Sequence, residues 1–199
     1  MESSSQTPST DNGPVAVVVD CETFDTGPKP VILSIGAVAV DTYTGKVVGE
    51  FYRLVDPTNA VQHGLTIGAD TVLWWMQQSE GARQALTHPS IGRASLPQAL
   101  GGLSGFFQLS QAETIWSNGA LADLQWLGNA YRACHLIPSW TYRQERCLRT
   151  LWDVVPVPKV IAALEHDALS DAKAHAQQML AAMSWLRDAS AAVPPCRLT

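Results

Sequence analysis

Two stretches near the start of the chain are almost wholly apolar, at residues 15–19 and 31–40, and a turn rich in Gly and Pro at 27–30 separates them. Short runs rich in β-branched residues are typical of strands that are covered on both faces. After a turn at 41–45, apolar and polar residues alternate through 46–54, which is the pattern of a third strand. These patterns predict a three-stranded antiparallel meander at the start of the fold.

The rest of the chain alternates between helical and strand-like segments. Asp70 or Thr71 can cap a first helix and Ser95 a second, because short polar side chains accept hydrogen bonds from the first turn. The expected elements are helices at 70–78, 96–108, 120–134 and 168–189 and strands at 114–117 and 144–147. The helix at 120–134 should carry one apolar stripe, formed by Leu121, Leu124, Gly128 and Tyr131. We therefore predict an α/β fold with a mixed five-stranded sheet flanked by helices.

Length and composition favour one folded domain. The chain has 199 residues, of which 46% are hydrophobic, and this is enough for one sizeable core. Residues 1–13 are polar and rich in Ser and Thr, so we expect a disordered leader. The predicted domain covers residues 14–190, and residues 191–199 are expected to form a flexible tail.

The charge of the chain bears on its partners. Lys and Arg total 13 and Asp and Glu total 18, and the net charge of −5 by itself argues against a nucleic-acid partner. This objection weakens if four of the acids bind metal ions, because most of the acidic excess would then be neutralised within one site. The sequence has no run of about 18 apolar residues, so a membrane partner is not expected.

The cysteines carry no sign of a structural zinc site or a disulfide. The four of them form no Cys-x-x-Cys pair, and they stand at positions 21, 134, 147 and 196. We expect reduced thiols, with Cys21 and Cys134 buried in apolar elements, and a cytoplasmic location.

Asp20 and Glu22 stand two residues apart at the end of the first predicted strand. Side chains alternate along a strand, so both carboxylates should project to one face while Cys21 points to the other. Adjacent acids at the open edge of a buried sheet favour a hard cation such as Mg²⁺, which prefers oxygen ligands. The pair alone leaves an alternative open, an acidic pair on a surface strand.

Three further residues extend this acidic group. Asp123 falls in the first turn of a predicted helix, where an acid can equally serve the helix dipole. His166 and Asp171 lie five residues apart at the start of the last predicted helix, and five residues on a helix are about 140° apart. Both can therefore face one site only if His166 lies on the preceding loop, a position that suits a mobile general base. An exposed histidine at the helix entry is the alternative.

The order and spacing of these residues resemble the three motifs of the DEDDh exonucleases. The motifs are Asp20-Cys21-Glu22-Thr23, then Asp123 after Trp116-Ser117-Asn118-Gly119-Ala120, then His166-x-Ala168-x-x-Asp171-Ala172. The resemblance spans roughly residues 15–185. It implies an RNase H-like fold, which the predicted order of elements also suits.

Other segments resemble one branch of that family, which holds phage T4 exonuclease A, exonuclease VIII-like domains and mycobacterial-type 3′→5′ exoribonucleases. These segments are Ile35-Gly36-Ala37-Val38, Thr71-Val72-Leu73-Trp74-Trp75-x-x-Gln78 with Ala82-Arg83, and Arg146-Cys147-Leu148-Arg149-Thr150. The likeness to this branch implies a bacterial or phage-encoded protein.

The family resemblance implies a 3′→5′ exonuclease that depends on two Mg²⁺ or Mn²⁺ ions. Asp20 would bridge the two ions, Glu22 and Asp171 would hold one of them, and Asp123 would support the other directly or through water. His166 would act as the general base toward the attacking water. The expected product is a nucleoside 5′-monophosphate.

Substrate contacts are expected beside these residues. Trp74 and Trp75 are adjacent, so on a helix they point about 100° apart and cannot be buried equally. One of them could stack on a base, and burial of both in the core is the alternative. The other candidates for contact with the sugar or phosphates are Thr23, Asn118, Arg146 and Arg149, of which the two arginines could equally belong to an ordinary exposed face.

We expect the substrate to be the 3′ end of single-stranded DNA or RNA, or a 3′ overhang. The sequence does not distinguish the two polymers. Two other functions stay open: a phosphodiesterase for short oligonucleotides, which the lack of a broad basic surface supports, and a catalytically silent RNase H-like binding module. Exposed tryptophans could also serve a homodimer.

Overall fold

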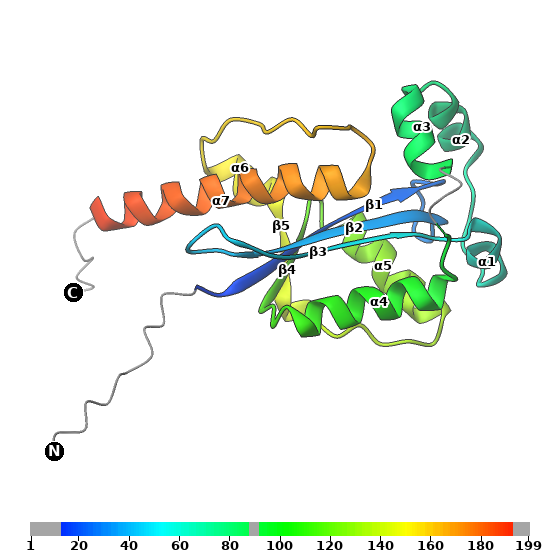
Figure 1. Cartoon of the computed structure of the whole chain (residues 1–199), viewed down its shortest axis with the longest axis horizontal. Coiled ribbons are helices and arrows are strands. Elements are labelled where there is room, and N and C mark those ends of the chain that lie inside the picture. The colour runs from blue at the N-terminus through cyan, green and yellow to red at the C-terminus, as the bar shows by residue number, and fades with distance from the viewer. Residues whose placement is uncertain (1–12, 88–91, 193–199) are drawn as a thin grey trace, which may run out of the picture.

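The computed structural model of the protein describes residues 13–87 and 92–192. At its centre is a five-stranded sheet with the strand order β3-β2-β1-β4-β5 (Figure 1). The strands are β1 (Val15–Thr23), β2 (Ile32–Asp41), β3 (Val47–Leu54), β4 (Thr114–Ser117) and β5 (Glu145–Cys147). The first three pair antiparallel, and β4 and β5 continue the sheet in parallel with β1. The predicted meander and the two later strands are confirmed.

Helices cover both faces of the sheet. They are α1 (Pro57–Gln62), α2 (Ala69–Met76), α3 (Glu80–Thr87), α4 (Leu96–Leu109), α5 (Asp123–Ala133), α6 (Leu148–Val154) and α7 (Ala168–Ala192). The long helix α7 crosses one face, α4 and α5 lie on the other, and α1, α2 and α3 gather at the end of the sheet where β1 ends (Figure 1). Among the helices of residues 13–87 and 92–192, none combines the length and hydropathy of a membrane span.

The strand alternation of β1 divides the apolar core in two. Val17, Val19 and Cys21 pack into the larger core, which contains buried residues of α4 and α5. Ala16 and Val18 point to the opposite face and pack with residues of α6 and α7. Because residues two apart share a face, this division places the next even positions of β1 on the α7 side.

Several helix boundaries differ from the prediction. Neither Asp70 nor Thr71 caps α2, because the helix starts earlier, with Gly68 in the N-cap position. The helix expected from residue 120 starts at Asp123, since residues 120–122 form a turn. Leu121 is consequently 88% exposed and does not belong to the buried stripe. The capping of α4 by Ser95 is confirmed, with Gln98 completing a capping box.

Three short helices, α1, α3 and α6, were not predicted. Helices of six to eight residues show too few turns for an apolar period to be read from sequence. For α1 a local signal exists, because the Asp56 carboxylate accepts from Thr58 N at 2.9 Å and Pro57 occupies the first turn. The predicted leader 1–13 and tail 191–199 lie outside the described residues, apart from Gly13 and the last two residues of α7. The main-chain nitrogen of Gly13 donates a hydrogen bond to the Asp41 carboxylate.

Gly36 on β2 lets α7 approach the sheet closely. It pairs with Asp20 on one side and with Tyr52 on the other, so it occupies the same face as these two residues. A Cβ atom at this position would collide with the main chain of Ala168 and Leu169 at the start of α7. The absence of a side chain at Gly36 thus positions the start of α7 next to the end of β1.

We expect Gly36→Ala to lower the free energy of unfolding by about 1–3 kcal/mol, because a methyl group at this point must displace helix backbone. Urea denaturation measures the loss. Gly101→Ala is the matched control, since Gly101 lies in α4 with open space where its Cβ would be, and alanine there should add about 0.5–1 kcal/mol. Equal stability of Gly36→Ala and wild type would contradict the close approach.

Candidate active site

Asp20 and Glu22 lie at the carboxyl end of β1 on the face covered by α7, as the strand alternation predicted. Both line a cavity of about 360 Å³. Cys21 packs in the core of the opposite face. Glu22 is only 8% exposed, so its carboxylate is held among other groups of the protein rather than in bulk water. The end of β1 therefore brings two carboxylates to one buried edge of the sheet.

Asp123 is the first residue of α5 and adds a third carboxylate to this cavity. It is 5% exposed, and its Oδ1 accepts a hydrogen bond from the Cys21 main-chain nitrogen at 3.2 Å. Since β4 lies beside β1 in the sheet, the turn after β4 returns the chain to the end of β1. This hydrogen bond connects the start of α5 directly to the segment that carries Asp20 and Glu22.

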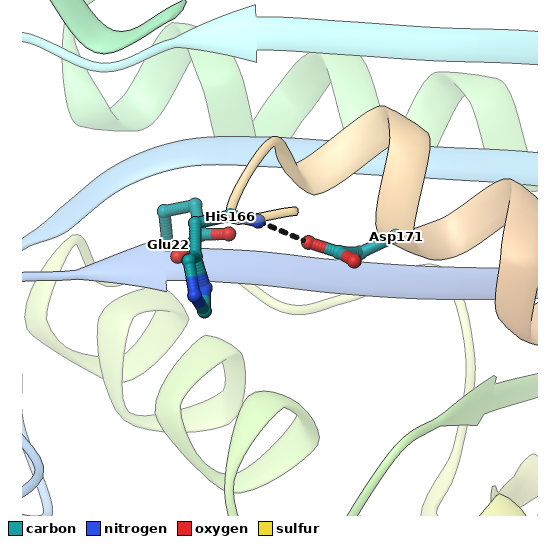
Figure 2. Close-up of side chains that lie close together, drawn as sticks. All are labelled: Glu22, His166 and Asp171. Atoms are coloured by element: carbon teal, nitrogen blue, oxygen red, sulfur yellow. Dashed lines mark hydrogen bonds between the residues drawn. The ribbon is translucent and has the colours of Figure 1, made fainter. Parts of the chain in front are cut away.

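His166 lies on the loop before α7, where the sequence prediction placed it. Its backbone is left-handed, with φ of 63°, a conformation uncommon for residues other than glycine and concentrated at functional sites. Its main-chain nitrogen donates to Asp171 Oδ2 at 2.9 Å (Figure 2). One ligand-type atom from each of Glu22, His166 and Asp171 lies within 4.8 Å of the others. The structure thus brings the end of β1 and the start of α7 together.

The buried carboxylates resist ionisation together. Burial, reinforced by the charges of Asp123 and Glu22, raises the pKa of Asp20 well above its usual range. Burial and the charges of Asp171 and Asp123 raise the pKa of Glu22 to about 8. Burial raises the pKa of Asp123 to about 7, although the hydrogen bond from Cys21 acts in the opposite direction. A cluster of this kind becomes fully charged at neutral pH when a cation compensates it.

The metal-free protein should lose stability as the pH rises from about 5 to about 8. An acid whose pKa is higher in the folded than in the unfolded state binds protons more tightly when folded. The stability that such an acid contributes is therefore present at low pH. It is lost as the pH rises through the pKa in the folded state, which is about 7 for Asp123 and about 8 for Glu22. The melting temperature, measured with EDTA across this range, should fall, and Mn²⁺ should restore it most strongly at the alkaline end.

Glu22→Gln provides the control for this pH dependence, because it removes one of the acids and retains nearly the same volume. The fall in melting temperature with pH should become shallower in this variant. A metal-free melting temperature that rises between about pH 5 and pH 8 would show that the carboxylates are not coupled in this way.

Two indole rings form a wall beside His166. The ring centroids of Trp74 and Trp75 lie 4.8 Å and 6.1 Å from the imidazole. Trp75 is 5% exposed and its Nε1 donates to the main-chain oxygen of Thr23 at 2.8 Å. Trp74 is 41% exposed. The two tryptophans are thus unequally buried, as predicted, and Trp74 is the ring with a free face.

A second cavity of about 410 Å³ opens beside the acidic one. It shares Glu22 with the acidic cavity, and Thr23, Trp74 and Trp126 also line it. Thr23 is mostly buried, and its hydroxyl donates to the Asp25 main-chain oxygen at 2.8 Å. A group held between these indoles would lie next to the carboxylates.

The polar candidates for phosphate contact separate into two groups. Asn118 and Arg149 line the acidic cavity, and Arg149 Nε donates to Asn118 Oδ1 at 3.2 Å. Arg146 donates instead to the main-chain oxygens of Arg143 and Glu145, and it does not line either cavity within the described chain. Arg146 and Arg149 flank the end of an edge strand, and only Arg149 turns toward the site.

Three charged or polar residues of the acidic cavity were not among the site residues predicted from the sequence: Lys159, Glu165 and His175. Lys159 comes from the loop between α6 and α7 and is the last of five basic residues between positions 132 and 159, a stretch that could indicate phosphate contacts or an ordinary exposed face. His175 lies on α7 four residues after Asp171, so the helical period could have indicated that it shares Asp171's face. Burial, with the positive charges of Lys159 and Arg149, lowers the pKa of His175 to about 4.

The exposed tryptophans give no support to the homodimer that the sequence left possible. Trp74 and Trp185 have the most exposed indoles named among the large apolar residues of the described chain. Trp74 belongs to α2 and Trp185 to the far part of α7, at opposite ends of the sheet (Figure 1). They do not form one surface.

Comparison with known proteins places these features in a family. The family model described as 3'-5' exoribonuclease Rv2179c-like domain matches residues 15–185. This match covers β1 to most of α7 and therefore includes all five residues of the resemblance motifs. No curated protein sequence matches the chain.

Solved structures show the same fold. E. coli exonuclease I in complex with a dT13 oligonucleotide is 14% identical with a TM-score of 0.65, over 89% of this chain and 43% of that chain. The nuclease domain of 3′hExo, a DEDDh family member bound to rAMP, is 16% identical with a TM-score of 0.60, over 88% of this chain and 93% of that one. This chain thus spans less than half of the exonuclease I chain. The sheet order and its flanking helices are those of the RNase H-like exonuclease fold.

Proposed function

The chain belongs to the Rv2179c-like 3′→5′ exoribonuclease domain family, and from this membership we propose that it is a divalent-metal-dependent 3′→5′ exonuclease. It hydrolyses the last phosphodiester of single-stranded DNA or RNA, or of a 3′ overhang, and releases a nucleoside 5′-monophosphate. The observation that carries this proposal is the convergence of Asp20, Glu22, Asp123 and Asp171 on one cavity beside a histidine on a loop.

The donor set fits two Mg²⁺ or Mn²⁺ ions. Oxygen ligands suit these hard cations, and burial, followed by the charges of neighbouring carboxylates, raises the pKa values of Asp20 and Glu22 in the metal-free protein. Asp20 would be shared between the ions, with Glu22 and Asp171 on one and Asp123 supporting the other. When bound, the ions supply Lewis-acid stabilisation of the phosphoryl oxygens and acidify water.

His166 acts as the general base in this proposal. A side chain near the carboxylates but outside the rigid helix can reach the attacking water and accept its proton at an imidazole nitrogen. The hydrogen bond from His166 N to Asp171 Oδ2 anchors its backbone, and the Trp74 ring restricts the imidazole on one side. The main chain is thus fixed while the ring faces the cavity.

The second cavity is the proposed site of the terminal nucleoside. Its indoles offer aromatic faces, and stacking on a ring is available to every base, as an exonuclease without sequence preference requires. Thr23 lies at the boundary with the acidic cavity, where a terminal sugar would be. Asn118 and Arg149, which line the acidic cavity and not the second one, would contact the phosphates of the strand.

Replacing the two tryptophans separately should give opposite results. Trp74→Ala is expected to raise KM about five- to 150-fold with little change in stability, because one stacked base contributes about 1–3 kcal/mol. Trp75→Ala is expected to lower the free energy of unfolding by about 3–5 kcal/mol, since it removes a buried ring and its hydrogen bond to Thr23. Steady-state kinetics and urea denaturation on both variants make the comparison. Two destabilised proteins with unchanged KM would assign both rings to the core.

The substrate class is tested with matched strands. Single-stranded DNA and RNA, duplexes with 3′ overhangs, duplexes with recessed 3′ ends, and a dinucleotide are each incubated with Mn²⁺, with Asp20→Ala as the inactive control. Degradation of the long single strands and overhangs supports the proposal. Hydrolysis of the dinucleotide alone would establish the short-oligonucleotide phosphodiesterase, and binding of strands with no hydrolysis would establish the silent module.

A further inference from the structure

His175 borders the acidic cavity on α7, one helical turn after Asp171. Its Nδ1 lies 3.7 Å from Asp20 Oδ1, and the side chains of both residues are about 15% exposed. The imidazole packs against the Trp152 ring at a centroid distance of 5.6 Å. A titratable ring is therefore held beside the carboxylate that is proposed to be shared by the two metal ions.

The orientation of the Asn118 amide follows from Arg149. A guanidinium only donates hydrogen bonds, and Arg149 Nε contacts Asn118 Oδ1 at 3.2 Å. The NH₂ group of Asn118 consequently points the other way, and it lies 3.2 Å from His175 Nε2. Arg149 thus determines which polar group of Asn118 faces the histidine.

The Asn118 amide in turn selects the tautomer of His175. An NH₂ group can only donate, so Nε2 of the ring must accept, and a neutral imidazole then carries its proton on Nδ1. The Nδ1–H is buried and finds no hydrogen-bond acceptor among residues 13–87 and 92–192 within normal distance. The carboxylate of Asp20 is the acceptor it approaches.

We propose that His175 is a positioning residue for Asp20: its Nδ1–H donates to Asp20 Oδ1, and the contacts from Arg149 to Asn118 and from Asn118 to His175 fix the ring in the tautomer that does so. This inference rests on the proposed function, because it assigns Asp20 to metal binding. A carboxylate held through one oxygen presents the other in a fixed direction. Outer partners of this kind commonly change metal affinity about 10–100-fold when removed.

Two conservative substitutions of His175 separate its two nitrogens. The amide nitrogen of Asn occupies nearly the position of Nδ1, so His175→Asn keeps a donor toward Asp20. The amide of Gln reaches the position of Nε2, so His175→Gln keeps only the contact with Asn118. Mn²⁺ binding to the substrate-free protein is measured by isothermal titration calorimetry, with the metal-free melting temperature as a check of folding.

We expect His175→Gln to weaken Mn²⁺ binding about 10–100-fold and His175→Asn to stay within about threefold of wild type. Equal affinity of wild type and His175→Gln would overturn the proposal, as would equal losses in both variants. Absence of Mn²⁺ binding in wild type would instead refute the metal site of the proposed function, so the two failures are distinguishable.

A spectroscopic measurement on the wild-type protein tests the tautomer without any substitution. Two-bond ¹H–¹⁵N correlation spectra separate the protonated from the unprotonated ring nitrogen of a neutral histidine. A proton on Nδ1 of His175 is the expected result. A proton on Nε2 would overturn the proposal, because Nδ1 would then direct a lone pair at the Asp20 carboxylate.

Discussion

Asp20→Asn is expected to reduce kcat/KM by about 10³-fold or more and, at the same time, to stabilise the metal-free protein. The loss of activity follows from the proposed shared role of Asp20, since metal ions contribute several kcal/mol to transition-state stabilisation and about 1.4 kcal/mol corresponds to a factor of ten. The gain in stability follows from electrostatics. Burial and the charges of Asp123 and Glu22 disfavour the ionised form of Asp20, and asparagine removes that charge.

The two effects are measured on one protein preparation, as hydrolysis rates with Mn²⁺ and as melting temperatures with EDTA. Asp188→Asn is the matched control, because Asp188 is exposed on α7 outside the cavity. It should leave both quantities unchanged. A destabilised Asp20→Asn protein that retains activity would contradict both the metal role and the charge repulsion, since functional sites are expected to reduce stability in exchange for activity.

His166→Ala is expected to lower turnover about 10²–10⁴-fold while leaving Mn²⁺ affinity within about threefold of wild type. A general base contributes to the proton transfer, so its removal lowers turnover. It does not bind the metal, so the Mn²⁺ affinity should stay unchanged. Kinetics with saturating Mn²⁺ and calorimetry without substrate provide the two values.

The close grouping of His166 with Glu22 and Asp171 gives this variant a second outcome. If His166 were itself a metal ligand, turnover and Mn²⁺ affinity would fall together, and the assignment as base would be wrong. His135→Ala is the matched control, because His135 is an exposed histidine that also has a left-handed backbone, with φ of 54°. The His135→Ala variant shows how much an alanine at a left-handed position changes stability when no active-site residue is removed.

The strands and the longest helix were predictable because their patterns are determined locally. Both faces of β1 and β2 are covered, so the runs at 15–19 and 31–40 are apolar throughout, and this pattern is visible in the sequence. The start of α5 was not predictable in the same way. Residues 120–122 can continue a helix by propensity, but the chain turns there to bring Asp123 against the Cys21 main chain. Tertiary contact overrode the local signal.

The relative placement of four of the five motif residues was predictable because single elements fix their spacing. Asp20 and Glu22 share a strand face, and His166 precedes the helix that carries Asp171. The cavity residues Lys159 and His175 were not predicted, since they reach the site through a long loop and a second helical turn whose position depends on Gly36. The different orientations of Arg146 and Arg149 were not predictable either. They look equivalent in the chain, and only the course of β5 into α6 directs Arg149 to the cavity.

The most direct test of the proposed activity is the identity of the first product released from a single strand labelled at its 3′-terminal nucleotide. With Mn²⁺ present, the labelled nucleoside 5′-monophosphate should be the first product released. Strands shortened at their 5′ end should not appear before it, and EDTA should abolish the release. Release of an unphosphorylated nucleoside, which would leave the phosphate on the 3′ end of the strand, or of internal fragments while the 3′ end stays intact, would contradict the proposed hydrolysis.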